Sequence, residues 1–209
     1  DEWCLMCMVM GMLVCAAAGA IILPPNSHWL WSRLEQDLRE QVVYAISGKL
    51  RGLSSSLESR TRDLMHQAYG LAAGKPQVQR QLLRWMFVVL EVGHAIIELR
   101  KEQAILPVHP AYAESQPWRQ SIRVMGRSLV RLFLQPGQSN LERALIAVDH
   151  AISRVQATDE PFAPHFDTSA LRRVKSYLHF IRTSLLDPQS PLAGYNHATA
   201  KPQGLEHAS

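Results

Sequence analysis

The 209-residue sequence contains few cysteines and few charged residues, and each scarcity excludes a class of protein. All three cysteines lie within the first fifteen residues, so they cannot cross-link the rest of the chain, and nothing requires an oxidising compartment. With 47% hydrophobic residues the chain is too apolar for a disordered tail, and eleven glycines are too few for a collagen-like fibre. The net charge of +4 is too small to indicate nucleic acid by itself.

Sequence motifs for nucleotide binding and hydrolysis are also missing. The chain has no G-x-x-x-x-G-K-[ST], no G-x-G-x-x-G after a strand, no G-x-S-x-G and no Cys/His zinc spacing. Apolar residues do not alternate with polar ones between hairpin signals, so no sheet is expected. The sequence therefore predicts an all-α protein that is not an enzyme, has no catalytic residues and needs no cofactor.

Residues 3–23 contain no charged or strongly polar side chain. A helix of this length is about 31 Å long, the thickness of a bilayer core, so we predict a transmembrane helix within a first region, residues 1–25. Asp1 and Glu2 precede it, and basic residues follow, which places the rest of the chain in the cytoplasm. These basic residues are Arg33, Arg39, Lys49 and Arg51. Since the chain opens without Met, we interpret the helix as the last span of a longer, multi-pass protein.

Helical periodicity continues through residues 26–190, which we predict to form a cytoplasmic antiparallel bundle of about five helices. The first helix spans 27–73 with a possible kink at Gly48 and Gly52, and the most apolar helix, 77–105, lies at the centre. The third helix spans 117–134. Residues 191–209 have no periodic apolar face and are predicted to be a disordered tail.

Two helices follow the third, and their expected ends rest on local signals. A capping box of Ser139 and Glu142 begins the fourth helix. Asp167 or Thr168 caps the fifth, which ends at the Asp-Pro pair of residues 187–188.

Two carboxylate–histidine pairs are candidate metal ligands. Glu91 and His94 form E-x-x-H on the central helix, and Asp63 and His66 form D-x-x-H on the helix before it. This spacing resembles that of a di-metal carboxylate site in a bundle, which also needs two carboxylates from other helices. The sequence offers none that is clearly placed, so the favoured interpretation is a polar stripe paired with neighbouring helices.

A basic helix face is the second candidate site. Arg119, Arg123, Arg127 and Arg131 recur at every fourth residue, and the segment 118–137 contains no acidic residue. Anionic lipid headgroups would suit such a face. Nucleic acid is not expected, because there is no helix-turn-helix spacing and no aromatic platform. A solvated face, or one paired within the molecule, remains the favoured alternative.

Three segments carry a family resemblance: Leu-Pro-Pro at residues 23–25, RWMFVVLEVGHAIIELR at 84–100 and FDTSALRRVKSYLHFIRTSLLDPQSPL at 166–192. Together they resemble the C-terminal part of the fusaric acid resistance family. The resemblance implies a bacterial inner-membrane exporter of aromatic acids, with cytoplasmic helical domains and a periplasmic adaptor subunit as a partner. It assigns no substrate-binding residue.

The sequence thus favours the C-terminal part of an efflux transporter for aromatic carboxylic acids or related toxic compounds, driven by a proton gradient. Membrane lipids would be its surroundings, and the apolar stripes of the last two helices suggest a homo-oligomer. The alternative is a single-span, membrane-anchored helical module that binds partner proteins or anionic lipid.

Overall fold

A computed structural model describes residues 7, 10–12, 28–105, 116–162 and 169–196. All regular structure in these ranges is helical, which confirms the all-α fold. The helices are α2 (His28–Ser47), α3 (Leu53–Leu71), α4 (Pro76–Ile105), α5 (Gln116–Leu134), α6 (Gln138–Phe162), α7 (Ser169–Leu186) and the 3-10 helix η2 (Pro191–Tyr195). The chain divides into two compact units, Asp1–Arg33 and Leu34–Ser209, and the packing below is that of the second.

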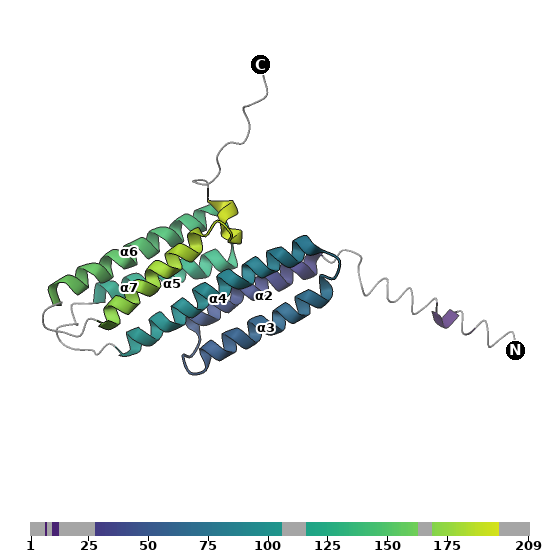
Figure 1. Ribbon diagram of the computed structural model, residues 1–209, viewed down its shortest axis with the longest axis horizontal. Helices are drawn as coiled ribbons and strands as arrows, with labels where there is room; N and C mark the ends of the chain where they lie inside the picture. Colours follow the sequence, from purple (N-terminus) through teal and green to yellow (C-terminus); the bar gives the residue numbers. More distant parts are fainter. Residues whose placement is uncertain (1–6, 8–9, 13–27, 106–115, 163–168, 197–209) are drawn as a thin grey trace, which may run out of the picture. The chain divides into compact units, whose positions relative to one another are not determined.

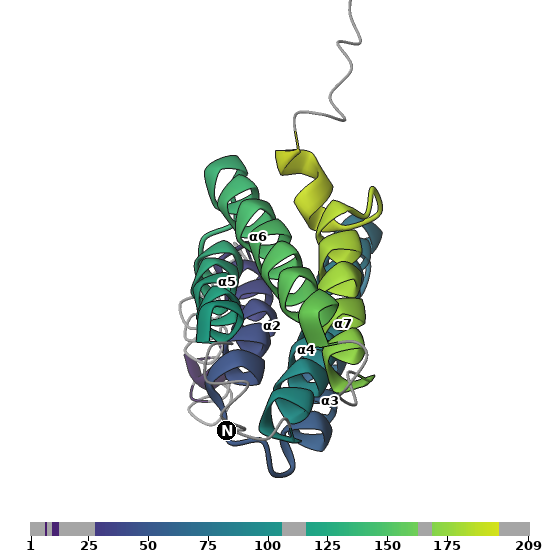
Figure 2. The ribbon, with the colours of Figure 1, turned by 90° about the vertical axis from the view of Figure 1, so that its left-hand side faces the viewer.

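Helix α4 lies at the centre of this unit, as the sequence predicted. It packs against α3 on one side and α7 on another, and α6 lies between α5 and α7 (Figures 1 and 2). Trp85 of α4 is buried and meets Phe133 of α5 edge-on, with ring centroids 6.4 Å apart. Burying two aromatic rings stabilises the contact of α4 with α5 beyond the area removed from water.

The predicted long helix over 27–73 is wrong, because the chain breaks into α2 and α3. Gly52 adopts a φ of 72°, a left-handed conformation that L side chains rarely tolerate and glycine permits. Arg100 of α4 donates hydrogen bonds to the carbonyl oxygens of Ala45 and Gly48, which lack partners at a helix end. The predicted kink is therefore a full break, and residues 28–186 contain six α-helices in the ranges that the structure describes, where about five were expected.

The structure also corrects two predictions near helix ends. Helix α6 begins at Gln138, so Ser139 lies inside it, and Glu142 accepts a hydrogen bond from the Gln138 side chain instead of completing a capping box. The predicted tail begins with η2, in which Leu192 is buried and the Ser190 hydroxyl accepts from the Leu192 amide.

Other predicted ends agree with the structure or fall outside it. Helices α4 and α5 span the predicted segments, and α7 ends just before the Asp-Pro pair, as expected. The predicted caps Asp167 and Thr168, and residues 197–209 of the tail, lie outside the described residues.

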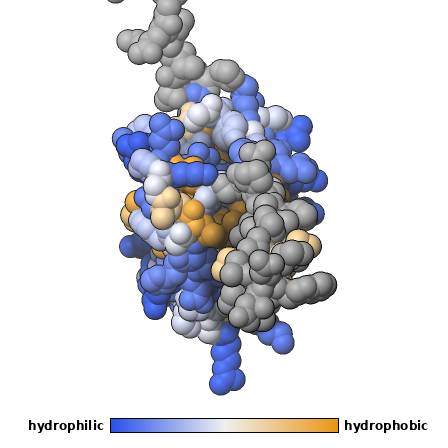
Figure 3. Space-filling model, turned by 90° about the vertical axis from the view of Figure 1, so that its right-hand side faces the viewer, coloured by the Kyte–Doolittle hydropathy of each residue, from blue (hydrophilic) through white to orange (hydrophobic). Residues whose placement is uncertain are grey.

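Within the part of the chain that the structure describes, no helix has the length and apolar character needed to cross a bilayer. The predicted span, residues 3–23, lies outside that part except for Cys7 and residues 10–12, which are helical and exposed. On the face shown in Figure 3, hydrophilic side chains predominate around a small apolar area near the centre.

Candidate functional site

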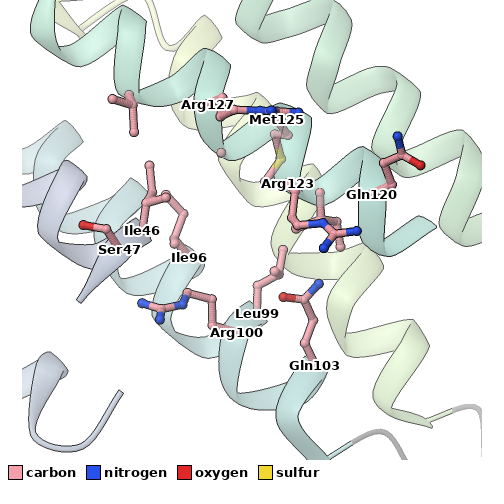
Figure 4. A pocket seen from close by; sticks show the side chains of 13 residues that line it. Ile46, Ser47, Ile96, Leu99, Arg100, Gln103, Gln120, Arg123, Met125 and Arg127 are labelled. Atoms are coloured by element: carbon pink, nitrogen blue, oxygen red, sulfur yellow. The ribbon is translucent and has the colours of Figure 1, made fainter. Parts of the chain in front are cut away.

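A groove of about 820 Å³ opens between α2, α4 and α5 and is the candidate site. Most of its lining is apolar. These side chains are Ile46 from α2, Ile96 and Leu99 from α4, and Ile122, Met125 and Val130 from α5. Arg100, Arg123 and Arg127 also line it (Figure 4). An apolar pocket of this size with a few polar groups is typical of small-molecule sites.

The geometry of α5 explains how charge and apolar surface meet in the groove. Arg123 and Arg127 are four residues apart, so they lie on the same face of the helix. Gly126 lies between them, and a Cβ atom there would stand 3.4 Å from Ile46 Cγ2. This is an ordinary van der Waals distance, so α2 and α5 lie within contact of each other at Gly126, where both line the groove.

Arg100 combines a structural role with a charge at the edge of the groove. Its guanidinium donates to the carbonyl oxygens of Ala45, at 2.6 Å, and Gly48, at 2.7 Å. Burial lowers the pKa of Arg100, yet arginine stays protonated because its ordinary pKa is so high. The groove therefore gains a fixed positive charge whose hydrogen bonds mainly stabilise the end of α2.

None of the acidic residues that the structure describes lines the groove. The nearest acids along α4 are engaged elsewhere: Glu98 pairs with Lys101 at 2.6 Å, and Glu102 accepts two hydrogen bonds from Arg173 of α7. The Arg123 side chain extends from α5 toward α4, and the amide of Gln103 points toward it (Figure 4). The groove therefore carries a net positive charge that suits an anion.

The four predicted arginines lie in three different surroundings. Arg119 donates to the Gln103 carbonyl oxygen at 3.3 Å and stacks 4.9 Å over the Trp118 ring, and burial lowers its pKa. Arg123 and Arg127 line the groove, whereas Arg131 is exposed in the last turn of α5 and does not. The sequence thus indicated two of the three groove arginines.

The structure does not assemble the predicted metal ligands. His94 Nε2 lies 3.4 Å from Glu58 Oε1, and His94 Nδ1 lies 3.4 Å from the Ser54 hydroxyl. Asp63 and His66 are exposed on α3. Among the residues described, no three His, Cys, Asp or Glu side chains gather closely enough to hold a metal ion. The histidine of the E-x-x-H pair is paired with a carboxylate from the neighbouring helix, at a position the sequence analysis did not consider.

Comparison with known proteins tests the resemblance directly. The model of the fusaric acid resistance protein family matches residues 5–192. The chain belongs to this family. It is 44% identical over 190 residues to the fusaric acid resistance protein FusD of Burkholderia cepacia, and the match covers 90% of this chain and 91% of that relative. No solved structure matches the chain.

Membership of the fusaric acid resistance family supports a role in resistance or transport at a membrane. It confirms the resemblance drawn from the three sequence segments. The family match extends across the groove-forming helices α2, α4 and α5 and also includes most of the predicted span.

Proposed function

We propose that this chain is the C-terminal part of a bacterial inner-membrane efflux transporter that exports aromatic carboxylic acids or related toxic compounds. The observation that carries the proposal is the family match over residues 5–192. A relative that covers 90% of this chain is named for resistance to fusaric acid, which is itself an aromatic carboxylic acid. Export that is driven by a proton gradient requires no covalent step. The protein is therefore proposed to be a transporter and not an enzyme.

In this proposal residues 3–23 cross the membrane and the helical unit lies in the cytoplasm. The support is the contrast between an uncharged first segment and the basic residues that follow it. Membrane lipids surround the span, a periplasmic adaptor subunit completes the export path, and further spans make the whole protein multi-pass. The apolar stripes of α6 and α7 are buried within the helical unit, as at Val148, Leu171 and Leu178, so the proposed homo-oligomer would need another surface.

A resistance assay tests the function. Deleting the gene in its own bacterium should lower the fusaric acid concentration that stops growth and raise the amount of acid retained in the cells. A plasmid copy should restore both values, whereas resistance to a toxic cation such as ethidium should not change. If the deletion strain expels and tolerates fusaric acid as the parent does, the proposal is wrong.

The alternative function, a single-span anchored module that binds partner proteins or anionic lipid, is favoured by the exposure of Arg123, Arg127 and Arg131 on one helix. Liposome flotation tests its lipid form. Binding that requires acidic lipid and weakens as salt is raised would support it, because salt screens exposed charges. Binding that is absent, or insensitive to salt, would exclude it.

A further inference from the structure

We propose that the groove between α2, α4 and α5 binds a small organic anion with an apolar body, with its carboxylate held by Arg123 and Arg127. This inference deepens the proposed function and rests on it for the biological meaning of the ligand. The binding site itself is argued from the described residues of the groove.

Two arginines provide the anion-binding end of the site. Arg123 and Arg127 are exposed and, among the residues that the structure describes, neither has an acidic partner. Arginine presents several N–H donors in a planar fork, so two of them one helical turn apart can hold one carboxylate from two sides. Arg100 adds positive charge nearby while its own hydrogen bonds hold α2. A carboxylate would therefore neutralise charge that the described residues leave uncompensated.

The apolar lining determines what must be attached to the carboxylate. Ile96 and Leu99 from α4 line the groove together with Ile122 and Met125 from α5. Those four side chains are at most 6% exposed, whereas Ile46 and Val130 are only half-buried. A bare inorganic anion would leave Ile46 and Val130 in contact with water, and an aromatic or branched aliphatic body would cover them. The volume of about 820 Å³ is large enough for a bicyclic ring system. The chemistry of the groove therefore favours an apolar monocarboxylate over phosphate.

Calorimetry on the full chain in detergent can test the site, with 2-naphthoate as the probe and a detergent-matched blank. Its amide, 2-naphthamide, has the same ring system without the charge. We expect saturable, one-to-one binding of 2-naphthoate and binding of the amide that is at least about tenfold weaker. Absence of saturable naphthoate binding, or equal affinity for the two compounds, would overturn the proposal.

Paired variants locate the site. The double variant R123Q/R127Q should bind 2-naphthoate at least about tenfold more weakly, because charge-assisted hydrogen bonds are lost. R131Q, on the same helix but outside the groove, should bind as the parent does. A groove-filling change, V130W, should also weaken binding, whereas V124W, at an exposed position of α5 outside the lining, should not. If R131Q weakened naphthoate binding as much as R123Q/R127Q does, or V124W as much as V130W, the ligand would bind outside the groove.

Two further comparisons separate this proposal from the others. If the chain binds phosphatidylglycerol vesicles through Arg123 and Arg127 but never binds 2-naphthoate, the groove holds a lipid headgroup and the proposal is wrong. If the gene restores fusaric acid resistance while the purified chain does not bind 2-naphthoate, the groove proposal fails and the transporter function stands. Naphthoate binding that depends on the two arginines, in a chain that confers no resistance, supports the groove and contradicts the function.

Discussion

Arg100 shows how one side chain stabilises the junction of two helices. It closes the end of α2 by donating to the carbonyl oxygens of Ala45 and Gly48. Replacing it with methionine keeps most of the apolar stem and removes both charged hydrogen bonds. We expect R100M to lower the free energy of unfolding by about 2–3 kcal/mol, because each lost bond leaves a carbonyl less well satisfied.

Urea unfolding of the full chain followed by circular dichroism measures this loss. R131M serves as the control, since Arg131 is exposed in the last turn of α5, and it should cost less than about 1 kcal/mol. A loss for R100M no larger than that for R131M would show that Arg100 does not hold the end of α2.

Unlike Arg100, whose hydrogen bonds are satisfied, Thr61 has a buried hydroxyl group that finds no hydrogen-bond partner among the described residues. The side chain is 1% exposed, and its oxygen has no hydrogen-bond partner among the described residues. Valine has nearly the same shape without the hydroxyl, so T61V should raise the free energy of unfolding by about 1 kcal/mol. T61S, which keeps the hydroxyl and loses a methyl group, should lower it by about 1 kcal/mol. Thermal unfolding of the two variants should shift in opposite directions, and a loss for T61V would mean that the hydroxyl has a partner.

At the residue scale, sequence analysis identified only those groove residues that share one helix. Arg123 and Arg127 could be identified from the sequence because residues four positions apart lie on the same face of a helix. Arg100 and Ile46 were not, because their contact with the groove depends on how α2, α4 and α5 pack. His94 illustrates the same limit: its partner Glu58 lies 36 positions earlier in the chain, and only the packing of α3 on α4 brings them together.

Two glycines within helices allow a prediction about helix packing. A Cβ atom at Gly93 of α4 would lie 2.8 Å from Leu57 Cδ2 of α3, whereas a Cβ at Gly70 of α3 would meet nothing within 4 Å. Alanine favours a helix over glycine by up to about 1 kcal/mol at either position. G70A should therefore stabilise the protein by about 0.5–1 kcal/mol, and G93A should lose that gain to crowding of about 1–3 kcal/mol.

Chemical unfolding of both variants beside the parent checks the difference. G70A should be more stable than G93A by at least about 1 kcal/mol. If G93A gained as much stability as G70A, the inference that Leu57 of α3 packs closely against Gly93 of α4 would be wrong.

At the scale of elements, local sequence predicted helices well and their ends less well. A helix over residues 77–105 was predicted correctly because both its long apolar run and the Pro at its start indicate a helix. This helix is α4 in the structure. The break after α2 was underestimated because Gly48 and Gly52 only weaken a helix locally. The decisive group, the Arg100 guanidinium, comes from another helix. Ser139 was a wrong start for α6 because the helix begins at Gln138, and the Leu141 amide donates to the Gly137 carbonyl oxygen.

The whole molecule combines a segment without charge with a helical unit rich in charge. Its mean hydropathy is −0.09, which alone would suggest no membrane association. All 22 Lys and Arg and all 18 Asp and Glu nevertheless lie outside residues 3–23. The helical unit has a buried core of its own, with Trp85, Trp118 and Phe133 almost fully covered. In the proposed topology, the uncharged segment therefore lies in the bilayer and the charged helical unit lies in water.

This separation predicts how the chain behaves in cells. The full chain should stay with the membrane fraction after an alkaline carbonate wash, because a span of about twenty apolar residues is not extracted by charge or pH. Deleting residues 1–27 should release the helical unit into the soluble fraction, since the groove and its arginines provide only charge-dependent attachment. A green fluorescent protein fused after residue 209 should fluoresce, because the proposed topology places the C-terminus in the cytoplasm. Extraction of the full chain by carbonate would contradict the predicted span. A truncated chain that stays on the membrane until salt is raised would instead show that the exposed arginines of α5 attach it to anionic lipid.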